Sequence, residues 1–178
     1  MEFNRDKFKA LVLYIIWRAG ERRDFGSTKL NKVLWFAEAR ANEAFGQPIA
    51  GETYIRDKFG PRPKHILEIQ GELENEGLIS VWSEPFFDHK ITRFRAFQPP
   101  DTSVFSPEEL SLIDWWIKHI DESHTAASIS EKSHDYAWQI AAMGEQLPLY
   151  AFLASRIREP RDEELDWAKE EAKTLGLK

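Results

Sequence analysis

Two pairs of an acid and a histidine give this sequence its clearest pattern for metal chemistry. Asp121 precedes His124 by three residues, and Glu131 precedes His134 by the same interval. Residues three apart on a helix project together, and Glu-x-x-His is a ligand pattern of helical bundles that bind two metal ions. Such a site also needs carboxylates from two further inward-facing helices. The inner faces of the first two predicted helices are apolar, so we predict no metal and no cofactor, with a metal-dependent hydrolase as the least favoured interpretation.

The motifs of covalent catalysis and phosphate binding are also missing from the sequence. The chain contains no cysteine, no Gly-x-Ser-x-Gly elbow and no Ser-x-x-Lys motif. Neither of the glycine-rich motifs that cradle phosphates occurs. We therefore predict a protein that is not an enzyme.

Length and charge favour a single globular domain with an acidic C-terminal part. The 178 residues fit one domain with an appendage, and 42% hydrophobic with 30% charged residues is typical of a globular protein. The net charge of −6 divides into +2 over residues 1–100 and −8 over residues 101–178. Apolar runs are too short to cross a membrane and the first residues lack a signal-peptide pattern, so we expect a cytoplasmic protein without membrane contact.

Hydrophobic spacing predicts a mainly α protein with a small β-hairpin, an α+β fold. The order helix–helix–helix–hairpin predicts a compact helical domain with a winged-helix-like front half. The helical phase also places Lys29 and Lys32 on the exposed side of the second helix. The predicted elements are helices over residues 5–19 and about 28–44, a rigid turn at Gly60–Pro63, a third helix starting at Pro63, and a hairpin of residues 78–83 and 91–97.

Capping signals predict further helices in the second half of the chain. Ser106-Pro107-Glu108-Glu109 is a capping box with proline at the first helical position, where its missing N–H costs nothing. Ser128 and Glu131 suggest a second capping box that opens a helix reaching about Met143. We divide the chain into a domain of residues 1–155, made of parts 1–100 and 101–155, and a charged, predicted helical extension of residues 156–178.

Aromatic residues outside the predicted core are candidates for contact with a protein partner. Trp115 and Trp116 are adjacent, so one helix cannot bury both on the same face. Tryptophan is enriched at protein interfaces, which favours one of this pair as an anchor. The other candidates are Phe86 and Phe87 in the hairpin and Trp167 in the acidic extension.

An ordered series of short motifs resembles the Panacea, or SocA-like, antitoxin domain. The series starts with Thr28-Lys29-Leu30-Asn31-Lys32 and an aromatic pair, continues with Tyr54 and Phe59-Gly60-Pro61, and ends with a Ser-x-x-x-His-x-x-x-Trp segment. The resemblance spans about residues 5–153. Its motif residues are Thr28, Lys29, Leu30, Lys32, Tyr54, Gly60, Pro61, His134 and Trp138.

The resemblance implies an antitoxin of a bacterial or phage toxin–antitoxin pair. Such a protein neutralises a cognate toxin by direct binding, and the founding member of the family delivers its toxin to a protease. The expected partners are therefore a toxin and, for a delivery role, a protease or chaperone. The alternative is a winged-helix-like DNA-binding regulator in which Arg22, Arg23, Lys29 and Lys32 contact phosphates. Four glutamates on the third predicted helix make DNA the less favoured partner.

Overall fold

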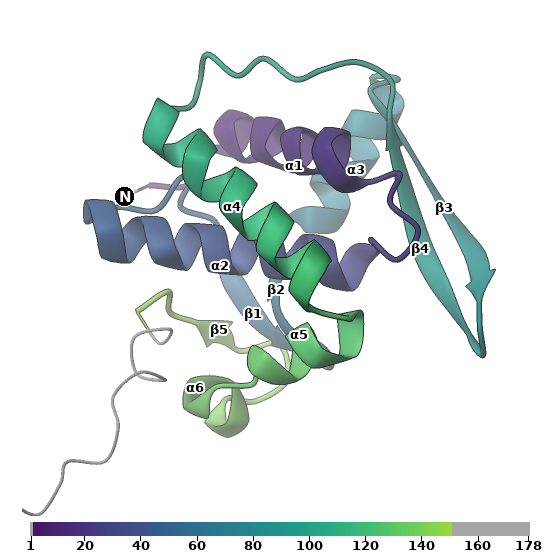
Figure 1. Cartoon of the computed structure of the whole chain (residues 1–178). Coiled ribbons are helices and arrows are strands. Elements are labelled where there is room, and N and C mark those ends of the chain that lie inside the picture. The colour runs from purple at the N-terminus through teal and green to yellow at the C-terminus, as the bar shows by residue number, and fades with distance from the viewer. Residues whose placement is uncertain (1, 151–178) are drawn as a thin grey trace, which may run out of the picture.

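Two long helices form the centre of the computed structural model, which describes residues 2–150 (Figure 1). α1 (Arg5–Ala19) and α2 (Ser27–Phe45) lie within one residue of the predicted bounds. Asn4 caps α1 by accepting a hydrogen bond from the Lys7 N–H at 2.9 Å. Gly46 ends α2 with a φ of 74°, a left-handed conformation that glycine adopts without strain. The predicted mainly helical α+β fold is confirmed.

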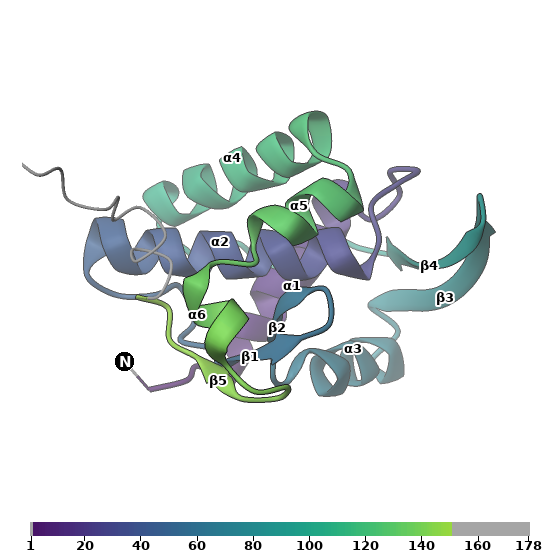
Figure 2. The same cartoon turned by 90° about the horizontal axis from the view of Figure 1, so that it is seen from below.

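α2 is covered on two opposite sides. α4 (Pro107–Ser123) crosses one side, and the small sheet described below lies on the other (Figure 2). Because neither side is left to solvent, α2 buries polar residues as well as apolar ones: Lys29, Lys32 and Glu38. The prediction that the two lysines are exposed is therefore wrong, since helical phase alone does not show how many sides of a helix are covered.

A three-stranded antiparallel sheet links the two halves of the chain. Its order is β2 (Gly60–Pro63), β1 (Tyr54–Asp57) and β5 (Gln146–Leu147). The segment Gly60–Pro63, predicted as a turn, is a strand whose partner is β1. Its two prolines are tolerated because β2 lies at the edge of the sheet, where a missing N–H breaks no second ladder.

The third helix leads into a long hairpin. α3 (Ile66–Asn75) begins three residues after Pro63, because Gly60–Pro63 is used as a strand. β3 (Ile79–Phe86) and β4 (His89–Ala96) pair from Ile79 with Ala96 to Phe86 with His89, so the strands extend closer to the tip than predicted. This hairpin projects from one side of the helical body (Figure 1).

Between residues 101 and 150 the structure has three helices where the sequence suggested two. The Ser106–Glu109 capping box opens α4 as predicted. The second capping box is wrong in position, because the Thr125 hydroxyl accepts from the Ser128 N–H and the Ser128 hydroxyl accepts from the Thr125 N–H. Asp135 then caps a new helix, so the segment is divided into α5 (Ala126–Lys132) and α6 (Tyr136–Ile140).

Residues 151–178 lie outside the described residues, and with them the predicted extension 156–178 and Trp167. Among the helices that the structure describes, none is both long and apolar enough to span a bilayer.

Arg93 anchors the hairpin to the loop between α1 and α2. Its guanidinium is almost fully buried and donates to the carbonyl oxygens of Glu21, at 3.1 Å, Arg22 and Arg23, at 2.7 Å. Hydrogen bonds from a charged donor to buried carbonyls are among the stronger ones in proteins. These hydrogen bonds therefore hold β4 against the loop between α1 and α2, while Phe94 of the same strand packs into the core.

We predict that Arg93→Met lowers the free energy of unfolding by about 3 kcal/mol, because three carbonyl groups lose their donor. The matched control is Arg95→Met on the same strand, whose guanidinium is exposed and pairs with Glu21 at 3.0 Å. An exposed pair of this kind is worth less than about 1 kcal/mol. Denaturant unfolding of both variants measures the two decreases in the free energy of unfolding. Equal decreases would contradict the anchoring role of Arg93.

Candidate functional site

Residues from opposite ends of the domain meet at the turn between β1 and β2. The Trp138 indole donates to the Asp57 carbonyl at 3.0 Å, and Ser130 Oγ donates to the Phe59 carbonyl at 2.9 Å. In return, Arg56 Nε donates to the Trp138 carbonyl at 2.9 Å. Side chains of the segment 130–138 therefore hold the turn by hydrogen bonds to its backbone carbonyl groups. Neither Ser130 nor Arg56 was predicted as a site residue.

Lys32 reaches the same turn from α2. Its side chain is 1% exposed, and its Nζ donates to the Pro61 carbonyl at 2.9 Å. Gly60 lies between this ammonium and Ser133, the residue that follows α5: a Cβ at position 60 would be 2.8 Å from Lys32 Nζ and 2.2 Å from Ser133 Oγ. Gly60 also has a φ of +97°, so both the space and the backbone conformation require glycine.

The other motif residues have different surroundings. His134 stacks on Trp138 with ring centroids 3.6 Å apart, and Tyr54 packs edge-on against Trp35. Lys29 is fully buried near the C-terminal end of α4, where its Nζ lies 2.7 Å from Asp24 Oδ2 and 3.9 Å from Asp121 Oδ1. The structure thus brings Lys32, Gly60, Pro61, His134 and Trp138 together, whereas Leu30 is part of the core and Thr28 lines a pocket.

Burial shifts the pKa values of two ionisable residues of α2. Loss of hydration lowers the pKa of Lys32 to about 7, against the opposing attraction of Asp57. Loss of hydration also raises the pKa of Glu38 to about 7, although its carboxylate accepts from the Ala50 N–H at 3.1 Å. Tyr54 is buried nearby with a hydroxyl that has no partner among the described residues, and its pKa is raised by burial and by Glu38.

Sequence reasoning missed Glu38 as a buried group, although a signal was present. Glu38 follows Leu30 and Leu34 at intervals of four residues, which places it on their buried face. A carboxylate there needs backbone N–H donors, and the glycine-containing loop after α2 supplies them through Ala50 and Gly51. Glu38 therefore fixes this loop rather than facing a ligand.

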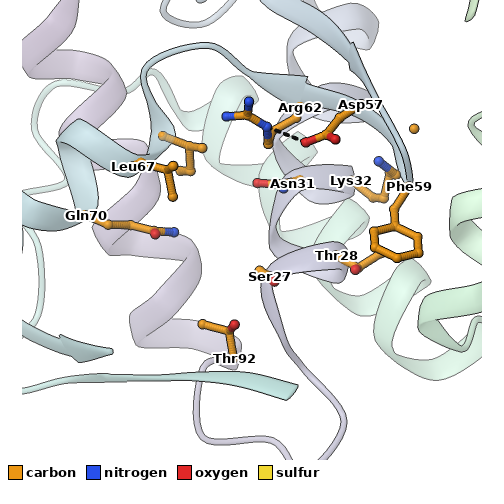
Figure 3. A pocket seen from close by; sticks show the side chains of 12 residues that line it. Ser27, Thr28, Asn31, Lys32, Asp57, Phe59, Arg62, Leu67, Gln70 and Thr92 are labelled. Atoms are coloured by element: carbon orange, nitrogen blue, oxygen red, sulfur yellow. Dashed lines mark hydrogen bonds and ion pairs between the residues drawn. The ribbon is translucent and has the colours of Figure 1, made fainter. Parts of the chain in front are cut away.

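A pocket of about 220 Å³ opens beside the β1–β2 turn (Figure 3). It lies between the start of α2, the hairpin β1–β2 and α3, with Thr92 of β4 at one edge. Arg62 Nε and Asp57 Oδ2 form an ion pair at 2.5 Å on its wall. Asn31, Gln70 and Thr28 add polar side chains to the lining.

The predicted interface residues within residues 2–150 lie on two separate surfaces. Trp115 is 54% exposed on α4, whereas Trp116 is buried and stacks on Phe36, which confirms that only one of the pair can be buried. Phe87 at the tip of the β3–β4 hairpin is the most exposed large apolar side chain of the described residues, at 83%. Phe86 is partly buried and packs edge-on against it.

Trp115 borders a shallow groove of about 490 Å³. The groove lies between the C-terminal end of α2, which contributes Phe45, and the first turns of α4. Phe45 is 45% exposed, so two aromatic rings face solvent here. The remaining lining residues are Pro107, Glu108, Ser111 and Leu112. We call this surface the α4 groove.

The residues expected to contact DNA are mostly engaged within the chain. Lys29 and Lys32 are buried, and Arg22 pairs with Asp121 of α4. On α3, the predicted recognition helix, Glu68 and Glu72 pair with Arg5 of α1, so these residues too are engaged within the chain. These contacts do not favour phosphate binding.

The predicted acid–histidine pairs do not converge. His134 stacks on Trp138, whereas His124 lies next to His119 with its Nδ1 3.2 Å from Ser128 Oγ. Within residues 2–150, no group of three or more potential ligands is arranged to hold a metal ion.

One comparison with known proteins gives a match. The family model described as "Antitoxin SocA-like, Panacea domain" matches residues 30–139. The matched stretch runs from α2 to α6. It therefore contains Lys32, the β1–β2 turn and the segment 130–138 that is hydrogen-bonded to the turn. No curated protein and no solved structure matches the chain.

We predict that Gly60→Ala lowers the free energy of unfolding by about 3 kcal/mol or more, because the new methyl group meets Ser133 and Lys32 in a strained backbone. Gly77→Ala is the matched control. Gly77 has a φ of +69°, but a Cβ there meets nothing within 4 Å. It should cost only the backbone strain of about 1–2 kcal/mol. Thermal or denaturant unfolding measures both variants. An equal decrease in the free energy of unfolding for the two would contradict the importance of the space around Gly60.

We predict that Glu38 makes stability fall as pH rises. Between the ordinary value of 4.5 and the folded-state pKa of about 7, the folded chain holds a proton that the unfolded chain has released. The free energy of unfolding therefore decreases across this window, by about 3 kcal/mol for this group.

The substitution Glu38→Gln should remove this contribution from unfolding free energies measured at pH 4.5 to 7. The control Glu122→Gln changes an exposed glutamate on α4 and should keep the wild-type pH dependence. A Glu38→Gln variant with the same pH slope as the wild type would contradict the assignment.

Proposed function

Because the chain belongs to the SocA-like Panacea domain antitoxin family, we propose that it neutralises a toxin protein by binding it directly, without a catalytic step. In this proposal the residues of the family motif stabilise the fold and do not contact the toxin. Lys32, Gly60 and Trp138 are occupied by contacts within the chain and hold the β1–β2 turn. Contact with a partner then falls to the surfaces that the scaffold leaves open.

The α4 groove is the observation that carries the proposal. Trp115 stands at 54% exposure beside Phe45, and Trp116 directly behind it is fixed by stacking on Phe36. Trp115 therefore packs on a fixed neighbour and still exposes part of its ring to solvent. This arrangement suits an interface anchor, because the ring contributes a large apolar area at little cost in side-chain entropy.

Charge indicates which kind of toxin surface fits the groove. Glu108 lines the groove and is exposed, and the chain carries −8 over residues 101–178. A toxin segment with lysine or arginine beside an apolar side chain complements both features. Such complementarity mainly accelerates association and excludes wrong partners, while the apolar anchor supplies affinity.

The fate of the bound toxin is a separate question. Direct blocking of the toxin and its delivery to a protease or chaperone both require a toxin-bound complex as the first step. The proposal therefore concerns that first step, and a test of toxin binding addresses both routes.

We predict that Trp115→Ser weakens binding to the cognate toxin by at least about thirtyfold, because the groove loses its anchor. Tyr136→Ser on α6 is the matched control. Tyr136 is 67% exposed but lies away from the groove, so binding should stay within about twofold of the wild type.

The measurement is the dissociation constant of the purified complex, together with rescue of growth when the toxin is co-expressed. A Trp115→Ser variant that folds and binds as the wild type does would exclude the α4 groove. Failure of the wild-type chain to bind or neutralise the toxin would overturn the proposed function.

A further inference from the structure

Phe87, in the turn between β3 and β4, has a backbone conformation that suits a different residue. Its φ is 53°, and no other non-glycine residue within residues 2–150 has a positive φ. Glycine and asparagine adopt this left-handed region readily, whereas a bulky residue strains the backbone there. The ring is 83% exposed and packs only edge-on against Phe86, so the core gains little from it. A strained, exposed aromatic residue of this kind points to a contact outside its own chain.

Positive charge surrounds this ring. We call residues 86–90 together with Arg23 the hairpin tip. The Arg23 guanidinium lies over the Phe87 ring, 5.9 Å from its centroid, and Lys90 follows three residues later. Both basic residues are exposed, and neither forms an ion pair with another described residue. Asp88 adds one carboxylate, so the hairpin tip carries two positive charges and one negative charge beside an apolar ring.

The α4 groove has the complementary character. Glu108 is exposed there and forms no ion pair with a described residue, whereas its neighbour Glu109 is held by Lys7 Nζ at 2.7 Å. α2 ends at this groove with no basic residue in its last turn, so the negative end of its dipole also favours a cation. Trp115 and Phe45 supply the apolar surface. The groove therefore fits an apolar ring with a basic side chain beside it.

The two surfaces lie at opposite ends of the molecule. The β3–β4 hairpin projects from one end of the helical body, and the C-terminal end of α2 with the first turns of α4 forms the other, in both views (Figure 1 and Figure 2). A chain therefore cannot place its own hairpin tip in its own groove, whereas a second copy can. The tip is narrow, because a turn of two residues joins the strands, and a narrow tip can enter a shallow groove.

We propose that the α4 groove binds the hairpin tip of a second copy of this chain. Phe87 of one copy packs against Trp115 and Phe45 of the other. Lys90 of the tip lies beside Glu108 of the groove. The contact is head to tail, because two different surfaces meet in it. It is also small, so we expect a weak association with a dissociation constant of about 10–100 µM.

The pairing needs no toxin, but its consequence for regulation rests on the proposed function. A toxin and a second copy then compete for the same groove. The free protein covers part of its toxin-binding surface by self-association, and a toxin that binds more tightly displaces the second copy. The inference thus names a regulator of the α4 groove, which is the chain itself.

Sedimentation equilibrium of the full chain between about 5 and 500 µM tests the pairing, since this range brackets the expected dissociation constant. The average mass of the wild type should rise with concentration. Phe87→Gly and Trp115→Ser should each weaken association at least about tenfold. Glycine suits the backbone at position 87, so the first variant keeps its fold. Tyr136→Ser, an exposed aromatic residue on neither surface, is the matched control and should associate as the wild type does.

Mixing the two variants tests the head-to-tail arrangement. Phe87→Gly chains keep an intact groove, and Trp115→Ser chains keep an intact hairpin tip. An equimolar mixture should therefore regain association that neither variant shows alone. A wild type that stays monomeric at about 500 µM, a mixture that does not associate, or variants that associate as the wild type does would each overturn the proposal.

Toxin binding separates this inference from the proposed function. Phe87→Gly should bind the toxin at least as tightly as the wild type, whereas Trp115→Ser should lose both interactions. An excess of toxin should dissociate the self-associated wild type, and copies that stay paired with toxin bound would overturn the competition. Toxin binding without self-association would overturn this inference alone, and self-association without toxin binding would overturn the proposed function alone.

Discussion

The backbone carbonyl groups of the β1–β2 turn are hydrogen-bonded from three directions, and the arrangement of the domain depends on this. Trp138 and Ser130 donate to Asp57 and Phe59, and Lys32 donates to Pro61. Buried carbonyl groups need such donors, because water cannot reach them. The contacts join α2, the turn and the segment 130–138, which are distant in the sequence. Pairing of β5 with β1 continues the same link, so the second half of the chain closes over the first.

This arrangement explains why polar residues of the family motif are buried. Lys32 and Glu38 lose hydration inside the domain, and each is retained by backbone groups: a carbonyl for the ammonium and N–H groups for the carboxylate. Buried ionisable groups of this kind specify one packing arrangement at a cost in stability. A motif built in this way defines a scaffold that many sequences can share. Our proposal assigns recognition of a partner to other surfaces, where the α4 groove and the tip of the β3–β4 hairpin expose aromatic rings.

The sequence predicted elements whose signals are local and failed where the outcome depended on distant partners. The periodicity of α1 and α2, the Ser106 capping box and the β3–β4 hairpin were all visible along the chain. Pairing of Gly60–Pro63 with β1 was not, because the two prolines favoured a turn over a strand. Burial of Lys29 and Lys32 was not visible either, since it requires knowing that α4 and the sheet cover opposite sides of α2. The pocket that Asn31 and Gln70 both line was not visible either, because it forms only where α2 and α3 come together.

The central claim is that the family motif builds the scaffold while the α4 groove contacts the toxin. Hydrogen–deuterium exchange of the full chain, alone and bound to its cognate toxin, tests this directly. The account predicts that binding slows exchange at the C-terminal end of α2 and in the first turns of α4, and that residues 54–63 and 130–138 exchange as in the free chain. Slower exchange confined to residues 54–63 and 130–138, with α4 unchanged, would contradict it.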